Sequence, residues 1–198
     1  MMSDNNSSKE LLLSSLNSFY NNHNIYKLTL KTIIEGKHEL SLRMIDWLVT
    51  RYAKTNNIIY WINDTDQNIY TNLPENYNNE KYRKITLYLD YRAQLKSFKK
   101  FNFDAFRRHD RISFNINDNE NENDNENEND MIETTIGQLN FFKWAFNTKI
   151  ITYALENQKK IYENMSKFSY KKQIKISNKN SLVPKQDIIN TKCFVIFD

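Results

Sequence analysis

A run of fourteen residues at positions 117–130, NDNENENDNENEND, limits most strongly what this chain can fold into. It consists of seven acidic residues and seven asparagines, so it contributes nothing to a hydrophobic core. We therefore expect a solvated insertion that separates two ordered parts of the chain. An alternative is that the acidic run mimics nucleic acid and shields a basic surface elsewhere on the protein.

The length of 198 residues fits a single domain interrupted by this run. We expect a disordered N-terminus at 1–9, the first part of the domain at 10–116, the insertion at 117–131, and a helical second part with a basic tail at 132–198. The chain has 12 Tyr, 12 Phe and 3 Trp. Each aromatic side chain buries roughly 150–250 Å², so a core can form although only 39% of the residues are hydrophobic.

Hydrophobic periodicity predicts an α+β fold, with a small mixed or antiparallel sheet packed by two to four helices. Thr135 followed by Gln138 is a capping box that predicts a helix start. We expect strands near 26–34, 58–62, 84–91 and 112–116, helices near 9–20, 41–54 and 135–165 with a break at 147–148, and a loop at 63–80. The apolar segment 193–197 is either a last strand or a docking peptide. The predicted core includes Leu48, Leu87, Leu89, Leu139, Phe142 and Phe146.

Cations alternate with phenylalanines between Arg92 and Arg111, where Asp104 and Asp110 are the only acids. Cations that neutralise phosphates beside rings that stack on bases are what binding of a nucleic-acid single strand requires. We call this candidate site the basic-aromatic patch. Its members are Arg92, Lys96, Lys99, Lys100, Phe101, Phe103, Arg107, Arg108 and Arg111.

Within the patch we expect two roles. Phosphate contacts are expected from Lys99, Lys100, Arg107, Arg108 and Arg111, and base stacking from Phe101 or Phe103. Full burial of either ring would contradict this stacking prediction. The alternative is that the phenylalanines belong to the core and that the stems of the lysines and arginines simply cover them.

Motifs for catalysis or cofactor binding are missing from the sequence. The histidines His23, His38 and His109 show no metal-binding spacing, and Gly36 and Gly137 are too far apart for a glycine-rich phosphate loop. Cys193 lies in an apolar segment and is expected to be a packed thiol. We therefore expect no enzyme activity, no metal, no cofactor and no small-molecule substrate. A metal-dependent nuclease would need Asp90, Asp104 and Asp110 to converge, whereas pairing of Asp104 and Asp110 with Arg107, Arg108 or Arg111 is the simpler expectation.

The sequence also bears on the compartment. It has no apolar run near the ~20 residues that span a bilayer, its N-terminus lacks a signal-peptide pattern, and a single cysteine favours a reducing environment. We expect a soluble intracellular protein that is neither secreted nor bound to membranes.

Three blocks of the chain resemble a conserved uncharacterised protein of nucleocytoplasmic large DNA viruses of the mimivirus kind. These blocks are IIEGKHELSLRMIDWLVTRYAKTNNIIYW (33–61), LYLDYRAQLKSFKKFNFDAFRRHDRISF (87–114) and TTIGQLNFFKWAFNTKIITYALENQKKI (134–161). The excess of asparagine, lysine, isoleucine and tyrosine fits an AT-rich genome independently. The resemblance implies a location in the virus factory of the host cytoplasm or in the virion, and it implies no mechanism.

Three functions follow as hypotheses. The first is a non-enzymatic viral accessory protein that binds DNA or RNA through the basic-aromatic patch, in transcription, genome organisation or packaging. The second is a structural or virion module whose basic surface contacts another viral protein. The third is the metal-dependent nuclease.

Overall fold

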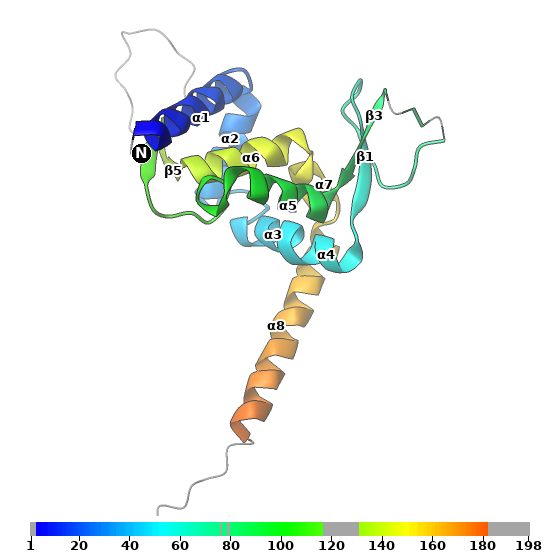
Figure 1. The fold of residues 1–198 in the computed structure, drawn as a ribbon. Coiled ribbons are helices and arrows are strands. Elements are labelled where there is room, and N and C mark those ends of the chain that lie inside the picture. The colour runs from blue at the N-terminus through cyan, green and yellow to red at the C-terminus, as the bar shows by residue number, and fades with distance from the viewer. Residues whose placement is uncertain (1–2, 76, 79, 117–130, 182–198) are drawn as a thin grey trace, which may run out of the picture.

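The computed structural model describes residues 3–75, 77–78, 80–116 and 131–181, with side-chain surroundings for those from 7 to 169. Helices and two small antiparallel sheets make up this part of the chain, so the predicted α+β class is confirmed (Figure 1). In chain order the elements are α1 (Ser3–Asn21), α2 (Asn24–Ile34), α3 (Leu42–Trp47), η1 (Leu48–Tyr52), α4 (Ala53–Asn56), β1 (Ile59–Asn63), β2 (Ile69–Tyr70), β3 (Tyr82–Thr86), α5 (Leu87–Phe98), η2 (Lys100–Asn102), β4 (Arg111–Asn115), β5 (Met131–Thr135), α6 (Ile136–Asn147), α7 (Ile150–Glu156) and α8 (Gln158–Ser181).

Two sheets join segments that are distant in sequence. The first has the strand order β2-β1-β3, with Tyr60 opposite Ile85. The second pairs β4 with β5, with Phe114 opposite Ile132. This second sheet connects the two sides of the acidic run, and Met131, which the sequence placed at the end of that run, begins β5.

Helix α6 lies at the centre of the packing (Figure 1). Its start agrees with the predicted capping box, because the backbone N–H of Gln138 donates to Oγ1 of Thr135 at 3.1 Å. Leu139, Phe142 and Phe146 are buried along it, as predicted. Helix α1 is fixed to it through the Tyr20 hydroxyl, which donates to the Leu139 carbonyl at 2.8 Å.

Several other predictions are confirmed. The helix expected near 9–20 lies in α1, the one near 41–54 in α3, η1 and α4, and the strands near 58–62 and 112–116 are β1 and β4. The helical region predicted at 135–165 has the expected break after Asn147, where Lys149 has a φ of 56°. A second break at Asn157 divides the rest, so the region forms α6, α7 and the first part of α8. Leu48 and Leu87 are fully buried.

The strand predicted at 26–34 is wrong, because these residues form α2. Tyr26, Leu28 and Leu30 alternate with polar residues, but Leu30 and Ile33 also recur at helical spacing. Packing decides between the two periods: Leu30 and Ile33 are buried in the core, whereas Leu28 points outward and is 52% exposed.

The strand predicted at 84–91 is also wrong beyond Thr86, where β3 ends and α5 begins. A carboxylate oxygen of Asp90 accepts a hydrogen bond from the Thr86 N–H at 2.9 Å, which satisfies a donor at the helix start and places a negative charge there. The helical turn carries Leu89 away from the core, so this residue is 63% exposed and its predicted core position is wrong.

Two further sequence-based boundaries change. Residues 3–9, expected to be disordered, belong to α1, and the expected loop at 63–80 contains β2. The acidic run at 117–130 and the segment 193–197 lie outside the described residues.

Candidate nucleic-acid interface

Helix α5 and the turn after it carry a row of exposed cations. Arg92 and Lys96 are four residues apart, which places them on one side of a helix about 6 Å apart along its axis. Lys100 follows in η2, and the three side chains with Ala93 and Leu95 line a shallow groove of about 520 Å³. We call Arg92, Lys96 and Lys100 the cation row. Within the described residues none of them forms an ion pair, and the same holds for the exposed Lys99 and Arg108.

The segment 99–110 folds back over the N-terminal end of α6. Two residues with positive φ delimit it, Lys99 at 61° and Asp110 at 57°. Between them Phe103 is 1% exposed and packs against Phe98 and Phe141, with ring centroids 6.2 and 5.4 Å away. Phe103 is therefore an anchor of the segment. Because its ring is covered by protein, the stacking prediction as made for the pair Phe101 and Phe103 is wrong.

Hydrogen bonds hold the same segment to α6. The Asp104 N–H donates to the Gly137 carbonyl at 3.2 Å, and the side chains of Gln138 and Asn140 donate to the carbonyls of Ala105 and Asn102 at 2.9 Å each. The sequence predicts the Gln138 cap but not these contacts across more than thirty residues. They fix the position of the basic-aromatic patch relative to the core.

Phe101 is the ring of the predicted pair that stays accessible. Its side chain is 50% exposed, and the Arg107 guanidinium lies 5.9 Å from its ring centroid, within the range of a cation–π contact. A ring in this position can stack with a base while the neighbouring cations contact phosphates.

The two remaining arginines of the patch have carboxylate partners. Arg107 contacts Asp110 at 2.5 Å and Arg111 contacts Glu133 at 2.6 Å. The hydrogen bond from Arg107 lowers the pKa of the Asp110 carboxyl, and this pair confirms the predicted role of Asp110. The structure thus separates the patch into cations that form no ion pair among the described residues and the paired Arg107 and Arg111.

The three aspartates considered for a nuclease have other roles. Asp90 holds the start of α5, and Asp110 pairs with Arg107. Asp104 accepts a hydrogen bond from the Phe106 N–H at 2.8 Å and forms no ion pair among the described residues, so its predicted pairing with an arginine is wrong. Among the described residues there is no group of three or more His, Cys, Asp or Glu side chains that could hold a metal ion. Asp46 lies near Asp104, and burial together with this second carboxylate raises the pKa of Asp46, while Lys100 opposes the shift.

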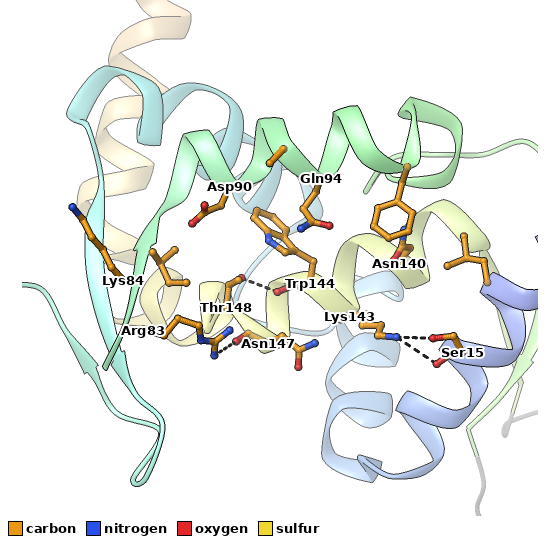
Figure 2. Close-up of a pocket in the computed structure, with 14 residues that line it drawn as sticks. Ser15, Arg83, Lys84, Asp90, Gln94, Asn140, Lys143, Trp144, Asn147 and Thr148 are labelled. Carbon is orange, nitrogen blue, oxygen red and sulfur yellow. Dashed lines mark hydrogen bonds between the residues drawn. The ribbon is translucent and has the colours of Figure 1, made fainter. Parts of the chain in front are cut away.

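A second candidate site was not found from the sequence. Between α5 and α6 lies a groove of about 510 Å³ that we call the α5–α6 groove (Figure 2). Its polar lining residues are Ser15, Arg83, Lys84, Asp90, Gln94, Asn140, Lys143, Asn147 and Thr148, and its apolar ones are Leu12, Ile85, Ala93, Phe98 and Trp144. The signal in the sequence is the spacing of Asn140, Lys143 and Asn147, which puts three polar residues on one side of a helix that is otherwise apolar.

Fold and surface together define an α+β protein with exposed cations on α5 beside a polar groove. The chain belongs to DUF7197, a family of unknown function, which matches residues 4–193. It is similar to the uncharacterized protein L507 of Acanthamoeba polyphaga mimivirus, with 32% identity over 180 residues, 91% of this chain and 61% of L507. The expected resemblance to an uncharacterised giant-virus protein is thereby confirmed.

Two other findings complete the comparison. The chain spans 61% of the length of the curated relative that it matches, and no solved structure matches it. In the part of the chain that the structure describes, every helix is too short or too polar to cross a membrane.

Proposed function

We propose that this chain is a non-enzymatic accessory protein of a giant virus and that it binds single-stranded DNA or RNA through α5 and the segment 99–110. The observation that carries the proposal is the cation row beside an exposed ring. Arg92, Lys96 and Lys100 form no ion pair among the described residues, although Lys100 lies within electrostatic reach of the Asp46 carboxylate. Phe101, which is nearby in sequence, is half exposed.

The pattern of pairing supports a phosphate ligand for the cation row. Arg107 and Arg111 on this surface form ion pairs with carboxylates, whereas the three side chains of the cation row form none among the described residues. Arg92 and Lys96 on one side of α5, with Lys100 in η2 beside the same groove, concentrate positive charge that an anionic strand would neutralise with release of its counterions. The phosphate contacts of the proposal therefore come from Arg92, Lys96, Lys99, Lys100 and Arg108.

The proposed place of action is supported by the viral relative. Similarity to a mimivirus protein supports a role in transcription, genome organisation or packaging, in the virus factory of the host cytoplasm or in the virion. Such processes expose single strands or need protein that covers them.

Binding of labelled single-stranded and duplex oligonucleotides, followed by fluorescence anisotropy, tests the proposal. The variant Arg92→Gln/Lys96→Gln/Lys100→Gln removes the cation row. The control Lys81→Gln/Lys159→Gln/Lys160→Gln makes the same change in net charge at exposed lysines outside the patch. We expect binding by wild type and control and loss of binding in the first variant.

An equal loss of affinity in both triple variants would contradict the proposal, because only total charge would then matter. Absence of binding to either oligonucleotide by the wild type at low salt would also contradict it. In that case the cation row would be assigned to an acidic protein partner, which a pull-down from infected cells would seek.

A further inference from the structure

The α5–α6 groove interrupts the apolar packing of the most buried helix. Two helices that face each other normally bury apolar side chains, but here α6 presents Asn140, Lys143 and Asn147, and α5 presents Asp90 and Gln94. The groove has a volume of about 510 Å³, within the range of roughly 300–1,000 Å³ that is typical of small-ligand sites. Its size fits one nucleotide.

The lining of the groove offers hydrogen-bonding groups without a partner in the described chain. The Trp144 side chain is only 7% exposed, yet its indole N–H has no acceptor among the described residues. No fully buried side-chain nitrogen or oxygen in the described part is unsatisfied, so this N–H reaches solvent where Trp144 lines the groove. The carboxamides of Gln94 and Asn147 likewise have no side-chain hydrogen bond to described residues. Together they can pair with the edge of a base.

The two ends of the groove carry fixed cations. Arg83 donates from Nη2 to the Asn147 carbonyl at 3.0 Å, and its Nε lies 3.6 Å from a carboxylate oxygen of Asp64. Lys143 donates from Nζ to Oγ of Ser15 at 3.0 Å. Figure 2 shows Arg83 and Lys143 on opposite sides of Trp144. A guanidinium has five N–H groups and an ammonium three, so both side chains keep donors for a ligand after making these bonds.

We propose that the α5–α6 groove receives one unpaired nucleotide of a bound single strand. The base lies at the centre, against Phe98 and within reach of Gln94, Asn147 and the Trp144 N–H, and the phosphates on either side of it contact Arg83 and Lys143.

Arg83 and Lys143 are two of three cations that line the groove, with Lys84 as the third and Asp90 as the carboxylate beside them. Cations at opposite ends match the two phosphates that flank a nucleotide inside a strand, whereas a nucleoside monophosphate has only one. Ala93 lines both this groove and the groove of the cation row, so a strand that follows α5 can place one nucleotide here. The inference rests on the proposed function in this respect.

The test uses two probes, a labelled single-stranded oligonucleotide and a nucleoside 3′,5′-bisphosphate that is followed by tryptophan fluorescence. The groove variant Gln94→Glu/Asn147→Asp keeps the shape of both side chains and adds two negative charges. The control Asn22→Asp/Asn24→Asp adds the same charge at exposed positions on the surface. Thermal melts establish that both variants fold.

We expect the groove variant to weaken oligonucleotide binding by about tenfold or more, since two hydrogen-bonding partners are lost, and to abolish the change in fluorescence with the bisphosphate. The control keeps both signals. Oligonucleotide binding that depends on the cation row but is unchanged in the groove variant would overturn the inference and leave the proposed function intact. Binding of the bisphosphate with no binding of any oligonucleotide would overturn both the inference that the groove receives a nucleotide of a strand and the proposed function.

Discussion

Gly137 lies where α6 and the segment that carries Phe101 come closest. A Cβ atom at this position would be 2.9 Å from the Phe101 carbonyl oxygen, 3.4 Å from Cδ of Arg107 and 3.5 Å from the Asp104 nitrogen. The first of these is a backbone atom, so Gly137→Ala must displace the segment 99–110 rather than rotate a side chain. The substitution therefore moves the basic-aromatic patch without removing any of its residues.

Two opposing effects set the magnitude for Gly137→Ala. Alanine is favoured over glycine inside a helix by about 1 kcal/mol, whereas overpacking of a filled site costs about 1–3 kcal/mol. We expect the steric cost to exceed the gain in helix propensity, with a net loss of about 1 kcal/mol in the free energy of unfolding. Because the segment 99–110 is displaced, we also expect weaker binding of single-stranded oligonucleotides. Chemical denaturation and fluorescence anisotropy measure the two quantities.

Gly36→Ala is the matched control for this prediction. Gly36 has a φ of 71° and no atom near the position of a Cβ, so alanine there costs about 1–2 kcal/mol through backbone strain alone. Its loss of stability should be similar while oligonucleotide affinity stays at the wild-type value. A gain in stability of Gly137→Ala with unchanged affinity would refute the close approach.

Three further predictions concern single residues. Phe103→Ala should lower the free energy of unfolding by about 3–5 kcal/mol because it empties a core position. Phe101→Ala should leave stability nearly unchanged and weaken oligonucleotide binding. The reverse pattern in denaturation and anisotropy would contradict the assignment of the two rings. Arg107 lowers the pKa of the Asp110 carboxyl, so the pair stabilises the fold above the unfolded pKa near 3.9 and this stabilisation is lost as pH falls below it. Asp110→Asn should therefore reduce the dependence of the melting temperature on acid pH. An unchanged dependence would count against the pair. Burial raises the pKa of the Tyr60 hydroxyl, which donates to a carbonyl at 2.7 Å; stability should therefore fall as pH rises above about 10, and Tyr60→Phe should weaken this dependence in alkaline melts.

The sequence predicts best where one hydrophobic period dominates over a long segment. The capping pair Thr135 and Gln138 and the spacing of Leu139, Phe142 and Phe146 are sufficient to identify α6 and its core face. Local signals succeed there because cap and periodicity point to the same element.

Short segments fail because two periods fit them equally well. Leu28 and Leu30 read as a strand, yet packing of Leu30 and Ile33 against the core selects a helix. The same holds at Leu89, where the carboxylate of Asp90 starts a helix in the middle of an alternating pattern.

The candidate site shows a similar division. The sequence identifies the cations of the patch, but it does not distinguish Phe101 from Phe103, since only the contacts with Phe98 and Phe141 bury one of them. The α5–α6 groove depends on a contact between helices separated by some forty residues in sequence. The polar spacing on α6 indicates a groove only when α5 is known to lie opposite these residues.

The salt dependence of single-strand binding tests the central claim most directly. If Arg92, Lys96 and Lys100 each neutralise one phosphate, the slope of log affinity against log salt should be shallower by about 2 in Arg92→Gln/Lys96→Gln/Lys100→Gln than in the wild type, at about 0.7 per contact. The control Lys81→Gln/Lys159→Gln/Lys160→Gln should keep the wild-type slope. Equal slopes in all three proteins, or a wild type whose binding does not depend on salt, would contradict a phosphate-binding surface on α5.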